Sequence, residues 1–200
     1  MNRISEMLWR VVAWVVTRDW VRAAIRKRAF ANPYVNITSA DGTDIYMGRW
    51  WLFNGYHLNG GHEFNPKHRE WLPSIRLHHI RRADNDRHVH DHPWNARTII
   101  MDSASDFGYV EERPEWNSDT APLTRFVRHV GYTGRLNFGQ YHRISEVPPA
   151  GVWTIFITWR KRGTWGFLVG REKVRYLDYF EQHKMANPYT SPSGDPVKPT

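Results

Sequence analysis

The densest signal in the sequence is Asp86-Arg87-His88-Val89-His90-Asp91-His92-Pro93-Trp94. Alternation along a β-strand places His88, His90 and His92 on one face. Same-face neighbours lie about 7 Å apart, so two imidazoles can converge on one ion with bonds of about 2.0–2.1 Å. Three histidines on a straight strand would reach the ion poorly. Pro93 ends the strand directly after His92, so the last pair is expected at the mouth of a barrel.

A lone histidine is usually a surface residue or a satisfied core residue, but three on one face are harder to explain in that way. Without a metal or an acidic partner, such a cluster loses solvation and repels itself at low pH. The remaining ligand must come from another strand. His142 lies in a predicted strand about fifty residues beyond His92. The residues alone therefore predict a metal site built on a pair of these histidines, with His142 as a candidate for the ligand from another strand.

The rest of the chain is mainly β. Short extended segments follow one another with Gly and Pro turn signals between most of them, which favours a sandwich or a closed barrel. An aromatic load of 11 Trp, 9 Tyr and 9 Phe also favours strands. We expect about nine strands with no helix of note after the N-terminal one. They are predicted at 45–53, 75–81, 96–101, 107–112, 124–130, 135–144, 152–159, 163–169 and 174–180.

Residues 3–28 are predicted to form an α-helix, with a stripe of arginines at Arg10, Arg18, Arg22 and Arg26. Residues 1–28 hold seven basic and two acidic side chains, so they carry +5 of the net charge of +8. We expect the helix to pack on its own barrel or on a partner subunit of a homo-oligomer, with the arginine stripe facing water. Contact with a membrane surface or with nucleic acid is the less favoured alternative.

Three parts of the chain are expected. Residues 1–34 form the helix and its connector, residues 35–182 form the barrel, and residues 183–200 form a Pro-rich tail. The chain has no cysteine, which excludes disulfides, zinc–thiolate sites and cysteine nucleophiles. No phosphate loop, dinucleotide fingerprint or nucleophile elbow is present. The apolar run Val11–Val16 is too short to span a bilayer, and we expect a cytoplasmic protein.

The chain resembles the cupin-type proteins commonly encoded by tailed bacteriophages over about residues 40–180. The resemblance rests on five segments: Leu77–Arg82, His90-Asp91-His92-Pro93-Trp94, His142-Arg143, Val152–Phe156 and Trp165-Gly166-Phe167. It implies a cupin-like double-stranded β-helix, a jelly-roll barrel, with the N-terminal α-helix in front. It also favours His90 and His92 over His88 as ligands. A phage-encoded protein of this kind would act in the bacterial host cytoplasm.

Two departures from the general cupin pattern bear on the metal. A Glu commonly follows the His-x-His pair by four or five residues, but Ala96 and Arg97 stand there, and the Pro-x-Gly before His142 is absent. The remaining three-histidine set resembles that of thiol dioxygenases and other non-heme iron cupins. It implies a divalent metal, with Fe(II) preferred and Zn, Ni or Cu as alternatives.

Three functions stay open: a metal-dependent, oxygenase-type enzyme acting on a small molecule, a non-catalytic module that binds a nucleotide or sugar, and a phage structural or interaction protein. Whether the protein is an enzyme is undecided by the sequence, because cupin barrels host many activities. Candidate residues for contact with a small-molecule ligand are Trp94, Tyr141, Trp153 and Arg160.

Overall fold

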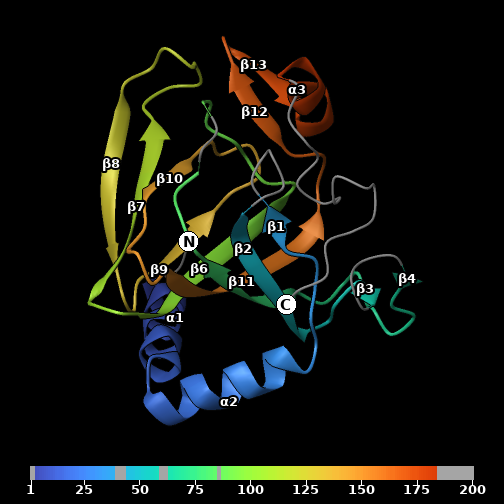
Figure 1. The fold of residues 1–200 in the computed structure, drawn as a ribbon, viewed down its shortest axis with the longest axis vertical. Coiled ribbons are helices and arrows are strands. Elements are labelled where there is room, and N and C mark those ends of the chain that lie inside the picture. Colours follow the sequence, from blue (N-terminus) through green and yellow to red (C-terminus); the bar gives the residue numbers. More distant parts are fainter. Residues whose placement is uncertain (1–2, 39–43, 59–62, 85–86, 184–200) are drawn as a thin grey trace.

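The computed structural model describes residues 3–38, 44–58, 63–84 and 87–183. Its largest unit is a six-stranded antiparallel sheet (Figure 1). The strand order in this sheet is β1 (Ile37–Thr38), β2 (Ile45–Phe53), β5 (Ser74–Ile80), β11 (Val152–Lys161), β6 (Trp94–Ser103) and β9 (Thr133–Leu136). A second antiparallel sheet has the order β10 (Arg143–Glu146), β7 (Phe107–Pro114) and β8 (Leu123–His129).

The two sheets share a hydrophobic core. Ile80, Ile100 and Val152 from the large sheet pack with Tyr109 and Ile144 from the small one. Two hairpins complete the described strands: β3 (His57–Leu58) with β4 (Glu63–Phe64), and β12 (Gly166–Val169) with β13 (Glu172–Arg175). The expected fold class is confirmed in that the protein is mainly β, with two antiparallel sheets packed over a shared core and helical structure before them.

The two faces of the large sheet have different characters. One face packs against helices α1 (Arg3–Val16) and α2 (Asp19–Phe30), through Ala13 and Ala29 of the helices and Leu77 of the sheet (Figure 1). The other face is turned to the barrel interior and is polar as well as aromatic. Its buried side chains include Arg49, Arg76, His78, Thr154 and Phe156.

The N-terminal segment differs from the single helix that we expected. It forms two helices because the chain turns at Thr17 and Arg18, whose side chains bond the carbonyl oxygen of Trp14. The expectation that the arginine stripe faces water is wrong for Arg22 and Arg26. Both of these side chains form ion pairs with Asp102 of β6, because this partly buried carboxylate needs cationic partners.

Three other expected elements are also corrected. The predicted strand 135–144 is two strands, β9 and β10, because Gly139 adopts a positive φ of 78° between them. Residues 174–180 divide between β13 and a third helix, α3 (Tyr176–Gln182), since its aromatic side chains recur at helical spacing and pack on Phe167. Residues 87–93 make isolated bridges instead of a regular strand.

The predictions for the two ends of the chain concern a C-terminal tail and an N-terminal segment too short to cross a bilayer. The predicted tail 183–200 lies outside the described residues except for His183. Among the helices that the structure describes, none has the length and hydropathy needed to cross a bilayer.

Candidate metal centre

Two of the predicted ligands are brought together by main-chain pairing. The N–H of His90 donates to the carbonyl oxygen of His142 at 3.0 Å, and the N–H of His142 donates back to His90 at 2.9 Å. His90 also forms a bridge with Phe167 of β12 on its other side. The HDHPW segment is therefore held between the chain that leads into β10 and the β12–β13 hairpin. This pairing places imidazoles from distant parts of the sequence side by side.

The three imidazoles converge at one point. One nitrogen from each of His90, His92 and His142 lies within 4.8 Å of the other two. The Nε2 atoms of His92 and His142 are 2.9 Å apart. Two nitrogens bound at right angles to one ion, each at about 2.0–2.1 Å, would be about 2.9 Å apart. The donor set and its spacing therefore fit a single divalent cation.

The surroundings of His90 and His92 favour neutral rings. Burial lowers the pKa of His90 from 6.5 to about 4, against an opposing effect of Asp84 and with a small contribution from His142. Burial also holds the pKa of His92 well below its usual value, helped by the charges of the other two histidines and of Arg76. A neutral imidazole has the free lone pair that a metal requires. The site is thus ready for a cation at neutral pH.

Glu111 of β7 stands behind His142. Its Oε1 lies 3.3 Å from Nδ1 of His142, the ring nitrogen that does not approach His92. Burial alone would raise the pKa of Glu111, but interactions with His142 and Arg113 lower it to about 2. Arg128 adds bonds of 3.0 and 2.8 Å to the same carboxylate. The contact with His142 is within ion-pair distance but does not have hydrogen-bond geometry in the described structure. A cation on Nε2 would favour an Nδ1–H that donates to this carboxylate, which would hold the ring in place.

Asp91, between the two ligands of the HDHPW segment, has an anchoring role. The side chain is fully buried, and its carboxylate accepts bonds from the N–H of Gly166 at 2.9 Å and from Nζ of Lys173 at 2.5 Å. A Cβ at Gly166 would collide with the backbone of Val174, so this close approach requires glycine. The Trp165-Gly166-Phe167 segment thus fixes the ligand segment in place.

His88 does not join the three histidines. Its Nδ1 lies 2.9 Å from the hydroxyl of Tyr179 in α3, and its Nε2 lies 3.6 Å from Asp119. The expected strand, with His88, His90 and His92 on one face, is not formed.

The predicted ligand-contact residues lie in different places. Trp94 lies near Arg76, whose guanidinium carbon is 5.0 Å from its ring centroid. Tyr141 is buried with Val89 and Leu168. Among the described residues, none of the four has a recorded ring contact with His90, His92 or His142. Trp153 lies on the helix-covered face and stacks on His79, while Arg160 is exposed near the end of β11.

Sequence reasoning missed three residues of the interior: Arg76, His78 and Glu111. All three are buried, at 2%, 7% and 2% exposure. The alternation of β5 was the available signal, because it puts Arg76 and His78 on one face and His79 on the other. The ring contacts follow this alternation, because His78 packs on Phe156 and His79 on Trp153.

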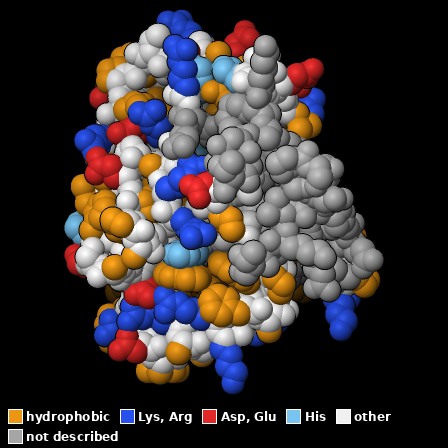
Figure 2. Space-filling view, in the orientation of Figure 1, with side chains coloured by type: hydrophobic (Ala, Val, Ile, Leu, Met, Phe, Trp, Pro, Cys, Tyr) orange, Lys and Arg blue, Asp and Glu red, His pale blue; other side chains and the backbone are white. Residues whose placement is uncertain are grey.

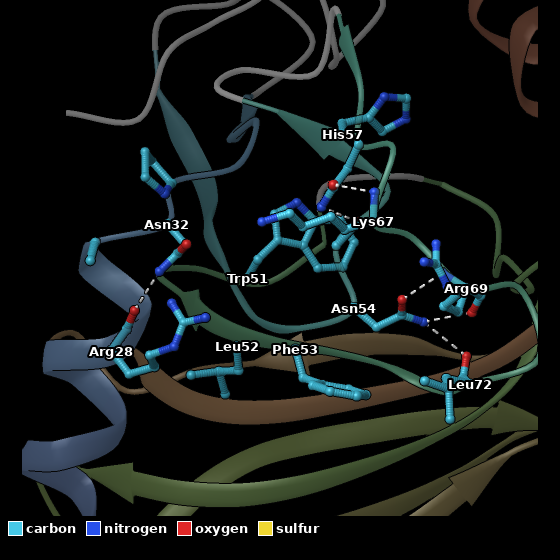
Figure 3. A pocket seen from close by; sticks show the side chains of 14 residues that line it. Arg28, Asn32, Trp51, Leu52, Phe53, Asn54, His57, Lys67, Arg69 and Leu72 are labelled. Carbon is cyan, nitrogen blue, oxygen red and sulfur yellow. Dashed lines mark hydrogen bonds between the residues drawn. The ribbon is translucent and has the colours of Figure 1, made fainter.

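A cavity of about 280 Å³ lies elsewhere, between the end of α2, the end of β2 and the loop after β4 (Figure 3). None of the three clustered histidines lines it. Its cationic side chains are Arg28, Lys67 and Arg69, and Trp51 forms part of its wall. Asn54 closes one side by donating to the carbonyl oxygens of Arg69 and Leu72. This cavity is separate from the candidate metal centre.

Comparisons with known proteins give only distant likenesses. No family model matches the chain, and no curated protein matches it. Among solved structures, it is similar to an RmlC-like cupin protein from Ralstonia eutropha (12% identity, 77% of this chain and 86% of that chain, TM-score 0.39). It is also similar to a cupin-like protein from Thermotoga maritima (12% identity, 68% and 83%, TM-score 0.35).

A third similar structure comes from a crystallographic study of DMSP lyases (13% identity, TM-score 0.37). The match covers 58% of this chain but only 48% of that one. Likenesses at these identities concern the fold alone.

Proposed function

We propose that this protein is a metal-dependent cupin that binds one divalent cation, Fe(II) by preference, through His90, His92 and His142. The observation that carries the proposal is the convergence of three histidine nitrogens within 4.8 Å of one another. A cation held there would supply Lewis-acid chemistry and, if it is iron, redox chemistry, with coordination positions left open for other ligands. We further propose that a small molecule reacts with oxygen at this site.

The chain's own residues support such a site in three ways. Burial keeps His90 and His92 unprotonated, so that no proton competes with the cation. Glu111 orients His142 from behind. The ring of Phe156 lies 5.5 Å from that of His92 and excludes water from one side of the cluster.

The test is elemental analysis of the purified protein after exposure to Fe(II), Mn(II), Ni(II), Cu(II) and Zn(II) in turn. We expect about one bound ion per chain. His90→Ala, His92→Ala and His142→Ala should each lose it, because two ligands make a weak site. Full occupancy in any of these variants would show that the ligand set is wrong. Oxygen consumption by the iron-loaded protein with candidate substrates then separates an oxygenase from a binding module.

A second candidate function is an interaction protein built on a cupin scaffold, and one observation favours it. Helix α1 exposes much of its apolar surface, including Met7, Leu8, Val11 and Trp14. Figure 2 shows hydrophobic and basic side chains next to one another over the lower part of the molecule, where α1 and α2 lie in Figure 1. In this case replacement of His90 would leave function intact. We propose a phage origin and a cytoplasmic location for either function.

A further inference from the structure

Arg76 occupies an unusual position at the centre of the large sheet. It pairs with Trp51 of β2 on one side and with Phe156 of β11 on the other. Its side chain is 2% exposed. The guanidinium carbon lies 5.4, 5.0 and 5.3 Å from the ring centroids of Trp51, Trp94 and Phe156. An arginine head group is thus enclosed by three aromatic walls.

This guanidinium has no acidic partner among the described residues. Nη1 donates to the hydroxyl of Tyr56 at 3.3 Å, but Nε and Nη2 are buried without any hydrogen-bond partner. Arg97, which is buried as deeply as Arg76, has the counter-ion that a buried arginine usually has: its Nη2 lies 2.6 Å from a carboxylate oxygen of Glu6. A buried cation without a counter-ion strongly destabilises a fold, and aromatic faces replace only part of the lost hydration.

The two unpaired nitrogens lie on the same edge of the guanidinium plane. Nε–H and one N–H of Nη2 are parallel on that edge and match the two oxygens of a carboxylate. We infer that Arg76 binds the carboxylate of a small-molecule ligand in a two-point contact. This inference rests on the proposed function, for which it names the substrate class: a carboxylic acid.

The carboxylate position lies close to the histidine cluster. The ring of Phe156, which packs on Arg76, is also 5.1 Å from the ring of His78 and 5.5 Å from the ring of His92. One aromatic ring therefore touches the anion-binding group and a candidate metal ligand together. Nε2 of His78 is also buried without a partner and offers the ligand another polar contact. A small acid held by Arg76 would extend toward His92.

The aromatic walls favour a carboxylate over a phosphate. A carboxylate is planar, carries one charge and can lie in the plane of the guanidinium between the rings. A phosphate dianion is tetrahedral and more strongly hydrated, so its transfer into this aromatic enclosure costs more free energy than that of a carboxylate. Inorganic phosphate is accordingly the negative probe.

The test is calorimetric titration and thermal unfolding of the full-length protein with metal removed by chelation. The probes are acetate and benzoate, with acetamide and benzamide as uncharged matches and inorganic phosphate as the other anion. We expect the two carboxylates to bind and to raise Tm, and the amides and phosphate not to do so. Arg76→Gln should lose carboxylate binding at least tenfold, and Arg76→Lys should recover only part of it. Arg171→Gln, which changes an exposed arginine in the turn between β12 and β13, is the matched control and should bind as the wild type does.

Stability without ligand separates binding from a structural role. If Arg76 is kept for binding, Arg76→Gln should unfold at the same or a higher temperature than wild type in the absence of anions. Absence of carboxylate binding to the wild type, or equal binding to Arg76→Gln, would overturn the inference. Metal analysis of the same proteins before chelation keeps the two proposals apart. Arg76→Gln should retain the metal, and a protein that binds carboxylate through Arg76 but no metal would refute only the proposed metal function.

Discussion

Oε1 of Glu111 lies 3.3 Å from Nδ1 of His142, while Nε2 of the same imidazole faces His92 at 2.9 Å. A carboxylate at this distance favours a proton on Nδ1, which leaves Nε2 available to bind a cation. We predict that Glu111→Gln lowers metal affinity about 10- to 100-fold without abolishing binding, because the ligand remains but loses its orienting partner. Competition with a chromophoric chelator measures this affinity.

The neighbouring Glu112 supplies a matched control for that variant. It is also buried on β7, but its carboxylate pairs with Arg143 at 2.7 Å and is not recorded in contact with a histidine of the cluster. Glu112→Gln should change stability and leave metal affinity within about twofold of wild type. Equal losses of affinity in the two variants would mean that Glu111 acts through the barrel as a whole and not through His142.

Stability of the metal-free protein should fall as the pH is lowered from about 6.5 to about 4. The folded-state pKa of His90 is about 4, below its ordinary value of 6.5, mainly because of burial. In this window the unfolded chain binds a proton that the folded chain does not, so acid favours unfolding. For His90 alone the effect is up to about 3 kcal/mol. Urea unfolding at a series of pH values measures it.

The matched variants for the pH experiment are His90→Asn and His129→Asn. The first removes the buried ring and should flatten the dependence of unfolding free energy on pH between 4 and 6.5. The second removes an exposed ring on β8 and serves as the control. An unchanged slope in His90→Asn would show that other groups control acid unfolding.

His88 should matter less to metal binding than His92. Its two ring nitrogens face Tyr179 and Asp119, so its loss removes contacts to α3 and to the loop after β7 but no nitrogen of the cluster. We expect His88→Ala to keep most of the metal and to lower Tm, whereas His92→Ala loses the metal. A metal titration in which both variants lose it equally would refute this order.

The local sequence pattern was enough to predict those strands whose ends are set by neighbouring turn residues. The strand over residues 45–53 was predicted to the residue, because its aromatic run has clear turn signals on both sides. The strand predicted at 135–144 was wrong because the break depends on one glycine with positive φ. The histidines could be nominated from their spacing. Arg76 could not be identified in this way. It stands out because two of its nitrogens have no hydrogen-bond partner among the described residues, and this depends on which side chains β2, β6 and β11 place around it.

The arginines of the N-terminal helices show the same limit. Their spacing suggested a solvated stripe, yet Arg22 and Arg26 bind Asp102, which lies about eighty residues away in sequence. These ion pairs use two of the seven basic side chains of residues 1–28. The net charge of α1 itself is only +1, from Arg3, Arg10 and Glu6. Both facts weaken the electrostatic attraction of this segment for an anionic membrane or for nucleic acid.

We propose that the exposed apolar surface of α1 is covered by a second copy of the chain. Met7, Leu8 and Val11 are 61%, 58% and 53% exposed, whereas Ala13 on the opposite side is fully buried against the sheet. A contiguous apolar surface of this kind usually marks a protein interface. The double variant Leu8→Gln/Val11→Gln should therefore convert an oligomer to a monomer, as measured by light scattering after gel filtration, without loss of metal. Trp71→Gln, which changes an exposed tryptophan distant from α1 in sequence, should leave the oligomer intact. A monomeric wild type that sediments with anionic vesicles, and fails to do so in the double variant, would assign the surface to lipid instead.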